Sequence, residues 1–261
     1  MRALKIAATG MSAQQMRVET ISNNLSNMST TGYNARRAEF ADLHYQQYAR
    51  AGAINASDGT VLPTGVQLGL GVRPAAVSIQ LAQGSLSATG GDLDVAIDGL
   101  GFLEVTLPSG ATAYTRDGGL KRTGEGLIVT SDGFPVAPEI VIPQDARSIS
   151  INAQGEIYAY FDDAAAGQLL GQFNLTGFSN AKGLEALGSN LFGETEASGP
   201  PVVSVPGADG LGTLRQGYLE DSSVDAVREI TELIEAQRGY EMNAKVISAA
   251  DQMMGATTQV R

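Results

Sequence analysis

Residues 230–254 read ITELIEAQRGYEMNAKVISAADQMM, a run without proline in which apolar positions recur at helical spacing. The recurring column, three or four residues apart, is Ile230, Leu233, Gln237, Tyr240, Ala244, Ile247, Asp251 and Met254. This spacing predicts an amphipathic α-helix, and the sequence SSVD at 222–225 resembles an N-cap that would start it. A helix of about 33 residues rises roughly 50 Å, which exceeds what one small domain needs. We therefore expect part of this helix to contact other chains.

The amino-terminal end carries a second heptad pattern. Its two columns are Leu4, Met11, Val18 and Leu25, and Ala7, Gln14, Ile21 and Met28. All nine prolines lie between residues 63 and 206, so both ends of the chain are free to be helical. Polar Gln14, Gln237 and Asp251 interrupt the two seams, which favours packing among many helices over an isolated two-helix coiled coil. The alternative, in which each stripe simply faces the chain's own core, remains open.

Between the helical ends the sequence predicts short strands joined by tight turns. The 32 glycines of the chain often stand in Asp-Gly or Gly-x-Gly turns. Strands are expected at 94–97 and 102–107 around one such turn, at 148–152 and 157–161, and along 169–178. The predicted fold class is therefore α+β, with long terminal helices that pack as a coiled-coil-like inner core and a β-rich middle domain inserted between them.

Changes in composition along the chain suggest five divisions. They are 1–45 for the first helix and the turn after it, 46–74 for an extended connector or hairpin, 75–206 for the β-rich domain, 207–221 for a returning linker and 222–261 for the last helix.

Composition excludes most catalytic chemistry. The chain has no cysteine, and His44 is its only histidine, so thiolate sites are impossible and most hydrolase constellations lack a base. The sequence GLG at 99–101 stands between two predicted strands, and Asp92, Asp94 and Asp98 lack the spacing of a calcium loop. We expect no catalytic residue, no metal and no cofactor, and hence no enzyme.

Charge is distributed unevenly. The net charge is −11, with six basic and three acidic residues in 1–50 but seven basic and nineteen acidic residues in 51–221. This balance disfavours nucleic acid and anionic membranes as partners, and it predicts an acidic outer surface on the middle domain. No apolar stretch of signal-peptide length follows Arg2 and Lys5, so we expect either a cytosolic protein or export without a cleaved leader, and no insertion into a membrane.

The most specific sequences flank the helical ends. Residues 21–27 read ISNNLSN and residues 29–33 read STTGY, while EAQRGYEMNAK occupies 235–245. These motifs resemble the terminal signatures of bacterial flagellar rod and hook proteins, and the likeness extends over essentially the whole chain. FADL at 40–43 and PTGVQLGLGVRP at 63–74 resemble the distal rod members of that family in particular. One departure is Gly239, which stands where the family usually has alanine.

The resemblance implies a structural subunit that polymerises into an open helical tube across the periplasm and transmits motor torque. Its implied partners are further copies of itself, proximal rod proteins, the hook protein, the rod cap, periplasmic and outer-membrane ring proteins and the flagellar export apparatus. Residues 46–63 resemble an insertion associated with a stiff, straight rod, and we expect them to wedge between neighbouring subunits; Gln46, Gly52, Asp58, Gly59 and Pro63 mark this segment.

Assembly is expected to rest on both terminal helices. The apolar contacts within and between subunits are expected from Leu4, Met11, Val18, Ile21, Leu25, Ile230, Leu233, Tyr240 and Ile247, with polar contacts from Asn23, Asn24, Asn27, Gln237 and Asn243. Two alternatives remain: a proximal rod or other hook-basal-body subunit, or, in a different class, a secreted β-rich adhesin or carbohydrate-active protein.

Overall fold

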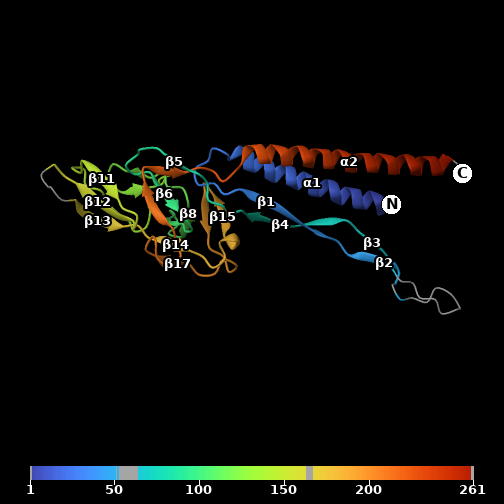
Figure 1. The fold of residues 1–261 in the computed structure, drawn as a ribbon, viewed down its shortest axis with the longest axis horizontal. Coiled ribbons are helices and arrows are strands. Elements are labelled where there is room, and N and C mark those ends of the chain that lie inside the picture. The colour runs from blue at the N-terminus through green and yellow to red at the C-terminus, as the bar shows by residue number, and fades with distance from the viewer. Residues whose placement is uncertain (1, 51, 53–63, 163–166, 260–261) are drawn as a thin grey trace. The chain divides into compact units, whose positions relative to one another are not determined.

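Both proline-free ends of the chain are helical in the computed structural model, which describes residues 2–50, 52, 64–162 and 167–259. Helix α1 is Arg2–Ser26 and helix α2 is Ala226–Gln259. The two helices run side by side in opposite directions (Figure 1). Helix α1 ends in a cluster of Ser and Asn, whose side chains compete with the helical hydrogen bonds of the backbone.

Helix α2 begins later than the sequence suggested. It starts at Ala226, four residues beyond the start expected at Ser222. The backbone N–H of Ser223 donates to the carbonyl oxygen of Tyr33 at 3.0 Å, and its Oγ accepts from the N–H of Ala35 at 2.9 Å. Residues near 223 are therefore committed to a neighbouring stretch of chain and not to the first turn of a helix.

The chain divides into two compact units. The helical unit contains residues 1–25, 36–78 and 226–261, and the β-rich unit contains 26–35 and 79–225. The α+β class expected from the sequence is present, but the connector belongs with the helices. The β-rich unit also takes in residues 207–225, most of which were expected to be a linker.

Two narrow ribbons complete the helical unit. Strand β1 (Arg36–Asp42) pairs with β4 (Val72–Ile79), and β2 (Tyr45–Ala49) runs antiparallel to β3 (Val66–Gly69), with Tyr45 opposite Gly69. The described parts of 46–74 thus form a hairpin-like ribbon. Asp58, Gly59 and Pro63 lie outside the described residues.

The β-rich unit is built from short strands in several small sheets. The four-stranded sheet has the order β15 (Glu185–Gly188), β16 (Leu191–Gly193), β8 (Thr112–Thr115), β7 (Leu103–Thr106), and the three-stranded sheet has the order β11 (Ser148–Ile151), β12 (Glu156–Tyr160), β13 (Gln168–Gln172). Two-stranded pairs join β6 (Val95–Asp98) to β18 (Thr213–Gln216), β5 (Leu86–Ala88) to β19 (Tyr218–Glu220), β14 (Leu175–Gly177) to β17 (Val202–Ser204) and β9 (Lys121–Arg122) to β10 (Ile128–Val129). A 3-10 turn, η1, covers Ala181–Gly183.

Apolar side chains from these strands form two packed clusters. The larger one is aliphatic except for Phe173, and its fully buried members include Ile97, Leu103, Ile128, Ile157, Phe173 and Leu214. The smaller one is mainly aromatic. The ring centroid of Phe102 lies 6.0 Å from that of Phe178 and 5.7 Å from that of Phe192, and the ring centroids of Tyr114 and Phe178 are 4.8 Å apart; all three pairs are edge-on. The β-rich unit therefore has a complete core of its own.

The strands differ from those predicted from the sequence in three places. The strands on either side of Gly99 do not form a hairpin, because β6 pairs with β18 and β7 pairs with β8. The expected strand 169–178 is broken into β13 and β14, and Phe173 at the break is fully buried. Residues 207–221 contain β18 and β19, so this segment is part of the sheet framework and not a linker.

Candidate assembly surface

Helices α1 and α2 approach each other at their small residues. A Cβ atom on Gly10 would lie 3.0 Å from the side-chain amide of Asn243, and one on Gly239 would lie 3.1 Å from the side chain of Gln14. Residues further along α1 therefore face residues earlier in α2, as expected for an antiparallel pair. Glycine at both positions lets the two backbones come close without displacing the amide side chains.

Polar contacts continue the same register toward the other end of the pair. The guanidinium Nη2 of Arg17 lies 3.3 Å from Oε2 of Glu232 and 3.6 Å from Oε2 of Glu235. The amide of Asn24 donates to Oε2 of Glu229 at 3.2 Å. Because the Arg17 pairs are partly exposed, they contribute little to stability, but they specify the register.

The inward side of α2 lies one residue away from the predicted column. Ala236 is fully buried, and Glu229, Glu232, Gly239 and Asn243 are half-buried beside it. Ile230, Gln237 and Tyr240, which were expected in the seam, are exposed. The reason is steric: the closest approach to α1 selects the small residues, and the larger apolar ones turn outward. Leu233 and Ile247 remain half-buried at the edge of the seam.

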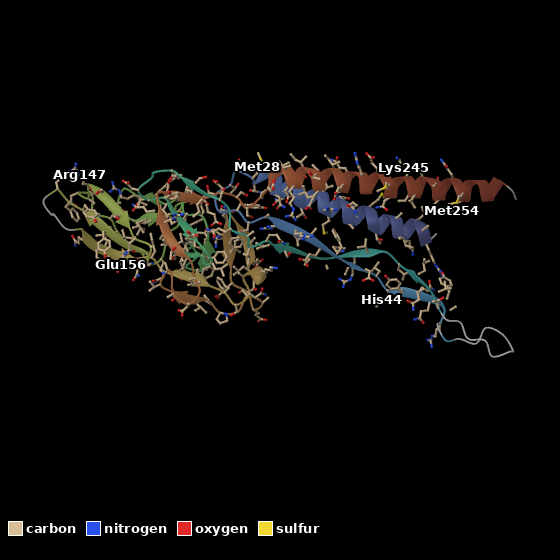
Figure 2. The ribbon with its side chains drawn as sticks, viewed as in Figure 1. Met28, His44, Arg147, Glu156, Lys245 and Met254 are labelled. Carbon is tan, nitrogen blue, oxygen red and sulfur yellow. The ribbon has the colours of Figure 1, made fainter. Side chains whose placement is uncertain are left out.

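The exposed side of α2 carries large apolar side chains among charged ones such as Arg238, Glu241 and Lys245. Its exposed apolar side chains, with their exposed fractions, are Val227 (77%), Ile230 (46%), Ile234 (46%), Tyr240 (44%), Met242 (61%), Val246 (49%) and Met253 (66%). Figure 2 shows Lys245 and Met254 on the carboxyl-terminal half of the same helix. Large apolar side chains left exposed in this number are suited to contacts with other chains.

The expected contacts of α1 are placed as follows. Ile21 is buried, and Leu4, Met11, Val18 and Leu25 are half-buried.

Asn24 does not face outward as expected for a contact between subunits. It is 1% exposed, its Nδ2 donates to the carbonyl oxygen of Arg36 at 2.8 Å, and its Oδ1 accepts from the N–H of Arg36 at 2.9 Å. Asn24 therefore joins α1 to β1 and α2 within one subunit. Asn23 is exposed, and Oδ1 of Asn27 accepts from the hydroxyl of Thr30 at 3.2 Å.

The β2–β3 ribbon exposes apolar side chains. Tyr45, Tyr48, Val66 and Leu68 are all more than two-fifths exposed, and the guanidinium of Arg2 lies 5.4 Å from the ring of Tyr48. Gln46, from the segment expected to wedge between subunits, lies in β2, and Gly52 is exposed with a positive φ of 84°. Since an isolated two-stranded ribbon has only marginal stability in water, this ribbon needs further packing partners.

The described residues hold no arrangement suited to bond-making chemistry. No three His, Asp or Glu side chains among them converge where they could hold a metal ion. A cavity of about 590 Å³ lies in the β-rich unit beside Leu100, Phe102 and Phe178. Arg116 lies in its wall, and the guanidinium group donates its hydrogen bonds to Glu220 and two backbone carbonyls. His44 is exposed on the connector between β1 and β2 (Figure 2).

One carboxyl group in the β-rich unit has a shifted pKa. Burial raises the pKa of Asp117 above its ordinary value, and the nearby charges of Asp132 and Asp94 raise it further, against a hydrogen bond from the N–H of Gly119 that lowers it. Among helices in the described part of the chain, none is both long and apolar enough to cross a lipid bilayer.

Three family profiles match separate parts of the chain. One described as flagella basal body rod protein matches residues 4–34, one described as flagellar hook protein FlgE/F/G D1 domain matches 96–159, and one described as flagellar basal body rod FlgEFG protein C-terminal matches 215–260. The first and third cover the two helices that build the candidate surface, and the second covers much of the β-rich unit.

Whole-length relatives agree with these profiles. The flagellar basal-body rod protein FlgG of Caulobacter vibrioides is 52% identical over 261 residues, covering 100% of both chains. Its namesake from Agrobacterium fabrum is 49% identical over 253 residues, covering 97% of both chains. The namesake from Buchnera aphidicola of Acyrthosiphon pisum is 47% identical over 257 residues, covering 98% of both.

Proposed function

Because this chain belongs to the bacterial flagellar basal-body rod protein family, we propose that it is a structural subunit of the distal rod, which spans the periplasm and carries motor torque to the hook. It is not an enzyme. The observation that carries the assembly mechanism is the set of large apolar side chains of α2 that a single subunit leaves exposed.

The mechanism is burial of these side chains against copies of the same chain. Ile230 and Ile234 are each about half exposed, and burying large apolar side chains contributes up to roughly 1.5–3 kcal/mol apiece. A contact that repeats head to tail, without closing a ring, generates an open helical filament. In this arrangement the terminal helices pack in a coiled-coil-like inner tube and the β-rich unit forms the outside.

The two helices contribute different contacts. Met11, Val18 and Leu25 of α1 would bury their half-exposed surfaces against helices of neighbouring subunits, and exposed Asn23 would supply lateral hydrogen bonds. On α2, Gln237 and Tyr240 would face neighbours, whereas Asn243 holds the register with Gly10 inside the subunit.

Residues 46–63 would add a wedge between subunits. The described start of this segment lies in the β2–β3 ribbon, whose exposed tyrosines need a partner surface. Deleting the segment should leave rods that bend, and straight, stiff rods from the deletion variant would rule the wedge out.

Specific basal-body partners follow from the same function. We expect contacts with proximal rod proteins, the hook protein, the rod cap, the surrounding rings and the export apparatus. Against the rings, an acidic β-rich surface would keep its hydration and oppose tight docking, so friction should change with salt.

The experiment is complementation of a strain that lacks its own distal rod subunit. The variant Ile230→Asp with Ile234→Asp should be exported and folded but should form no rod in electron micrographs of purified basal bodies. The matched control is Leu169→Asp with Leu187→Asp, which places the same two charges at side chains of similar exposure (53% and 51%) on β13 and β15 of the β-rich unit. Normal rods from the α2 variant would overturn the proposed assembly surface.

A further inference from the structure

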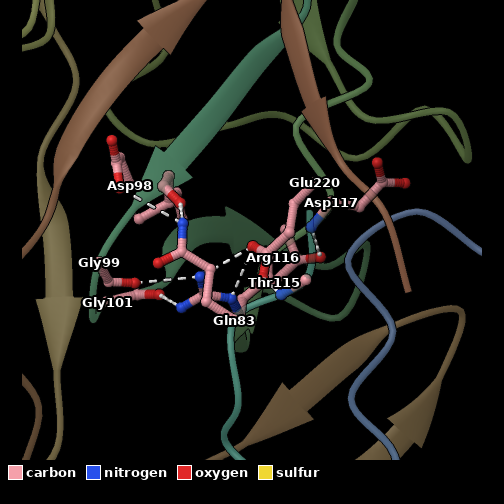
Figure 3. A network of polar contacts seen from close by, with 10 residues as sticks. Gln83, Asp98, Gly99, Gly101, Thr115, Arg116, Asp117 and Glu220 are labelled. Carbon is pink, nitrogen blue, oxygen red and sulfur yellow. Dashed lines mark hydrogen bonds and ion pairs between the residues drawn. The ribbon is translucent and has the colours of Figure 1, made fainter. Parts of the chain in front are cut away.

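A buried ion pair stands where both connecting segments meet the β-rich unit. Arg116 follows β8 and Glu220 ends β19, and the two residues are 6% and 3% exposed. Nε and Nη2 of Arg116 donate to Oε2 of Glu220 at 3.0 and 2.8 Å (Figure 3).

The remaining hydrogen bonds of the pair tie separate parts of the framework together. Nη1 of Arg116 donates to the carbonyl oxygen of Gly101 at 3.0 Å, and Nη2 donates to that of Gly99 at 3.1 Å (Figure 3). Oε1 of Glu220 accepts from the N–H of Gly84 at 3.1 Å. The pair therefore holds the turn after β6, the segment before β5 and the ends of β8 and β19 in one arrangement.

The two connecting segments are bonded to each other beside this pair. Residues 26–35 follow α1, and residues 221–225 precede α2. The N–H of Gly32 donates to the carbonyl oxygen of Glu220 at 2.8 Å, and the N–H of Ser223 donates to that of Tyr33 at 3.0 Å. The outgoing and the returning segment thus form a single strap.

The strap lies directly on the backbone of Arg116. Gly32 has a φ of +65°, and a Cβ atom on it would lie 2.8 Å from the carbonyl carbon of Arg116. Only glycine fits this approach without strain. Asn190 adds a lateral bond, from its Nδ2 to the carbonyl oxygen of Thr31 at 2.6 Å.

Stability alone gives no reason to place charges here, because a buried ion pair is often no more stabilising than apolar residues of the same volume. The pair differs from apolar packing in being directional. The four charge-assisted hydrogen bonds that Arg116 donates fix the positions of their acceptors, whereas apolar side chains in contact could shift past one another. Resting on the proposed function, we propose that Arg116 and Glu220 are a mechanical anchor. They pass load from the paired strap into the β-sheet framework.

The test variant combines Arg116→Met with Glu220→Gln in the full-length chain. It leaves no buried charge unpaired and keeps an acceptor for the N–H of Gly84, so the β-rich unit should still fold. Amide hydrogen exchange at Gly32 and Ser223 should accelerate about tenfold or more, because strap opening no longer requires the anchor to break. Swimming should be near wild type in dilute medium and should fail in viscous medium, where load on the rod is higher.

The matched control is Arg147→Met, which removes an ion pair of 3.0 Å whose two side chains are three-quarters exposed. It should change neither measurement. Ser223→Ala is a second probe, since it removes only the bond from the N–H of Ala35 and should accelerate exchange of that amide without endangering the core.

The outcomes separate the anchor from the function on which it rests. If the wild-type chain fails to restore rods to the deletion strain, the proposed function falls. If it restores them and the double variant matches it both in strap exchange and in swimming under load, the anchor is refuted. If the double variant does not fold, Arg116→Lys takes its place, because it keeps the charge and loses the forked geometry; unchanged exchange at Gly32 and unchanged swimming under load then refute the anchor.

Discussion

The two units of this chain bury their surfaces in opposite ways. The β-rich unit encloses large side chains such as Phe173, Ile157 and Leu214 completely, whereas the residues most buried in the helices are chiefly small, among them Ala7, Ala13 and Ala236. Several large apolar residues of α2, among them Ile230 and Ile234, are exposed instead. The β-rich unit has a closed core, whereas the helical unit has a seam of small residues and exposed apolar side chains.

The two units therefore differ in role: one folds around its own core, and the other exposes apolar side chains that suit contacts with copies of the chain. Because its core is complete, we expect the β-rich unit to stay folded before assembly. On the proposed function, the helical unit would reach its full stability only when copies cover α2, so folding of the ends and growth of the rod would be coupled. Substitutions should therefore divide into those that unfold the subunit and those that stop assembly.

The largest expected effect is in the closed core. Phe173→Ala should lower the free energy of unfolding by about 3–5 kcal/mol, because it leaves a cavity among fully buried neighbours. Ile234→Ala on α2 should change monomer stability by under about 0.5 kcal/mol. Urea denaturation of the monomeric full-length chain measures the free energy of unfolding of both variants. Equal losses of this free energy would contradict the difference between the two units.

The next effect concerns the seam between the helices. Gly10→Leu should force the side chain of Asn243 away and separate the helices, at a cost of about 1–3 kcal/mol. Ala8→Leu is the control, because Ala8 is exposed on the same helix. Helical circular dichroism during thermal unfolding reports the loss. If both variants melt alike, Gly10 does not set the helix approach.

A smaller effect is expected at Gly239. Gly239→Ala should gain up to about 1 kcal/mol from helix propensity, reduced by contact with the flexible end of Gln14 at 3.1 Å. In a Gln14→Ala background the full gain should appear. A double-mutant cycle measured by urea denaturation isolates this coupling, and additive effects would show that the two residues do not touch in solution.

The smallest effect is the pH dependence of Asp117. A carboxyl group with a raised pKa favours the folded state only while it is protonated, so stability falls as pH rises from its ordinary value of 3.8 through the raised one. Asp117→Asn keeps an acceptor for the N–H of Gly119 and should raise the urea midpoint at neutral pH but not in acid. Exposed Asp145→Asn should leave the profile unchanged. A neutral-pH loss in Asp117→Asn would contradict the assigned sign.

Local pattern was sufficient for several elements. The absence of proline and the spacing of apolar residues predicted both helices, and the strands expected at 148–152 and 157–161 correspond to β11 and β12. These elements depend on contacts between near neighbours in the sequence, which a sequence displays directly. The α+β class followed from the same patterns.

Long-range pairing was beyond such patterns. Nothing local to Thr213–Gln216 shows that it pairs with β6 more than a hundred residues earlier, so the local pattern predicts a linker at 207–221. The anchor likewise joins Arg116 to Glu220 across 104 positions.

The sequence by itself determined that the two ends are helical, that the middle is β-rich, and, through its signatures, that the chain resembles a rod protein. Only the tertiary structure decided which side of α2 faces inward. The apolar column and the small-residue column are one position apart, so periodicity alone could not choose between them. The choice fell to steric fit: Gly10 and Gly239 allow the closest approach of the backbones, and the larger apolar side chains are left on the outside.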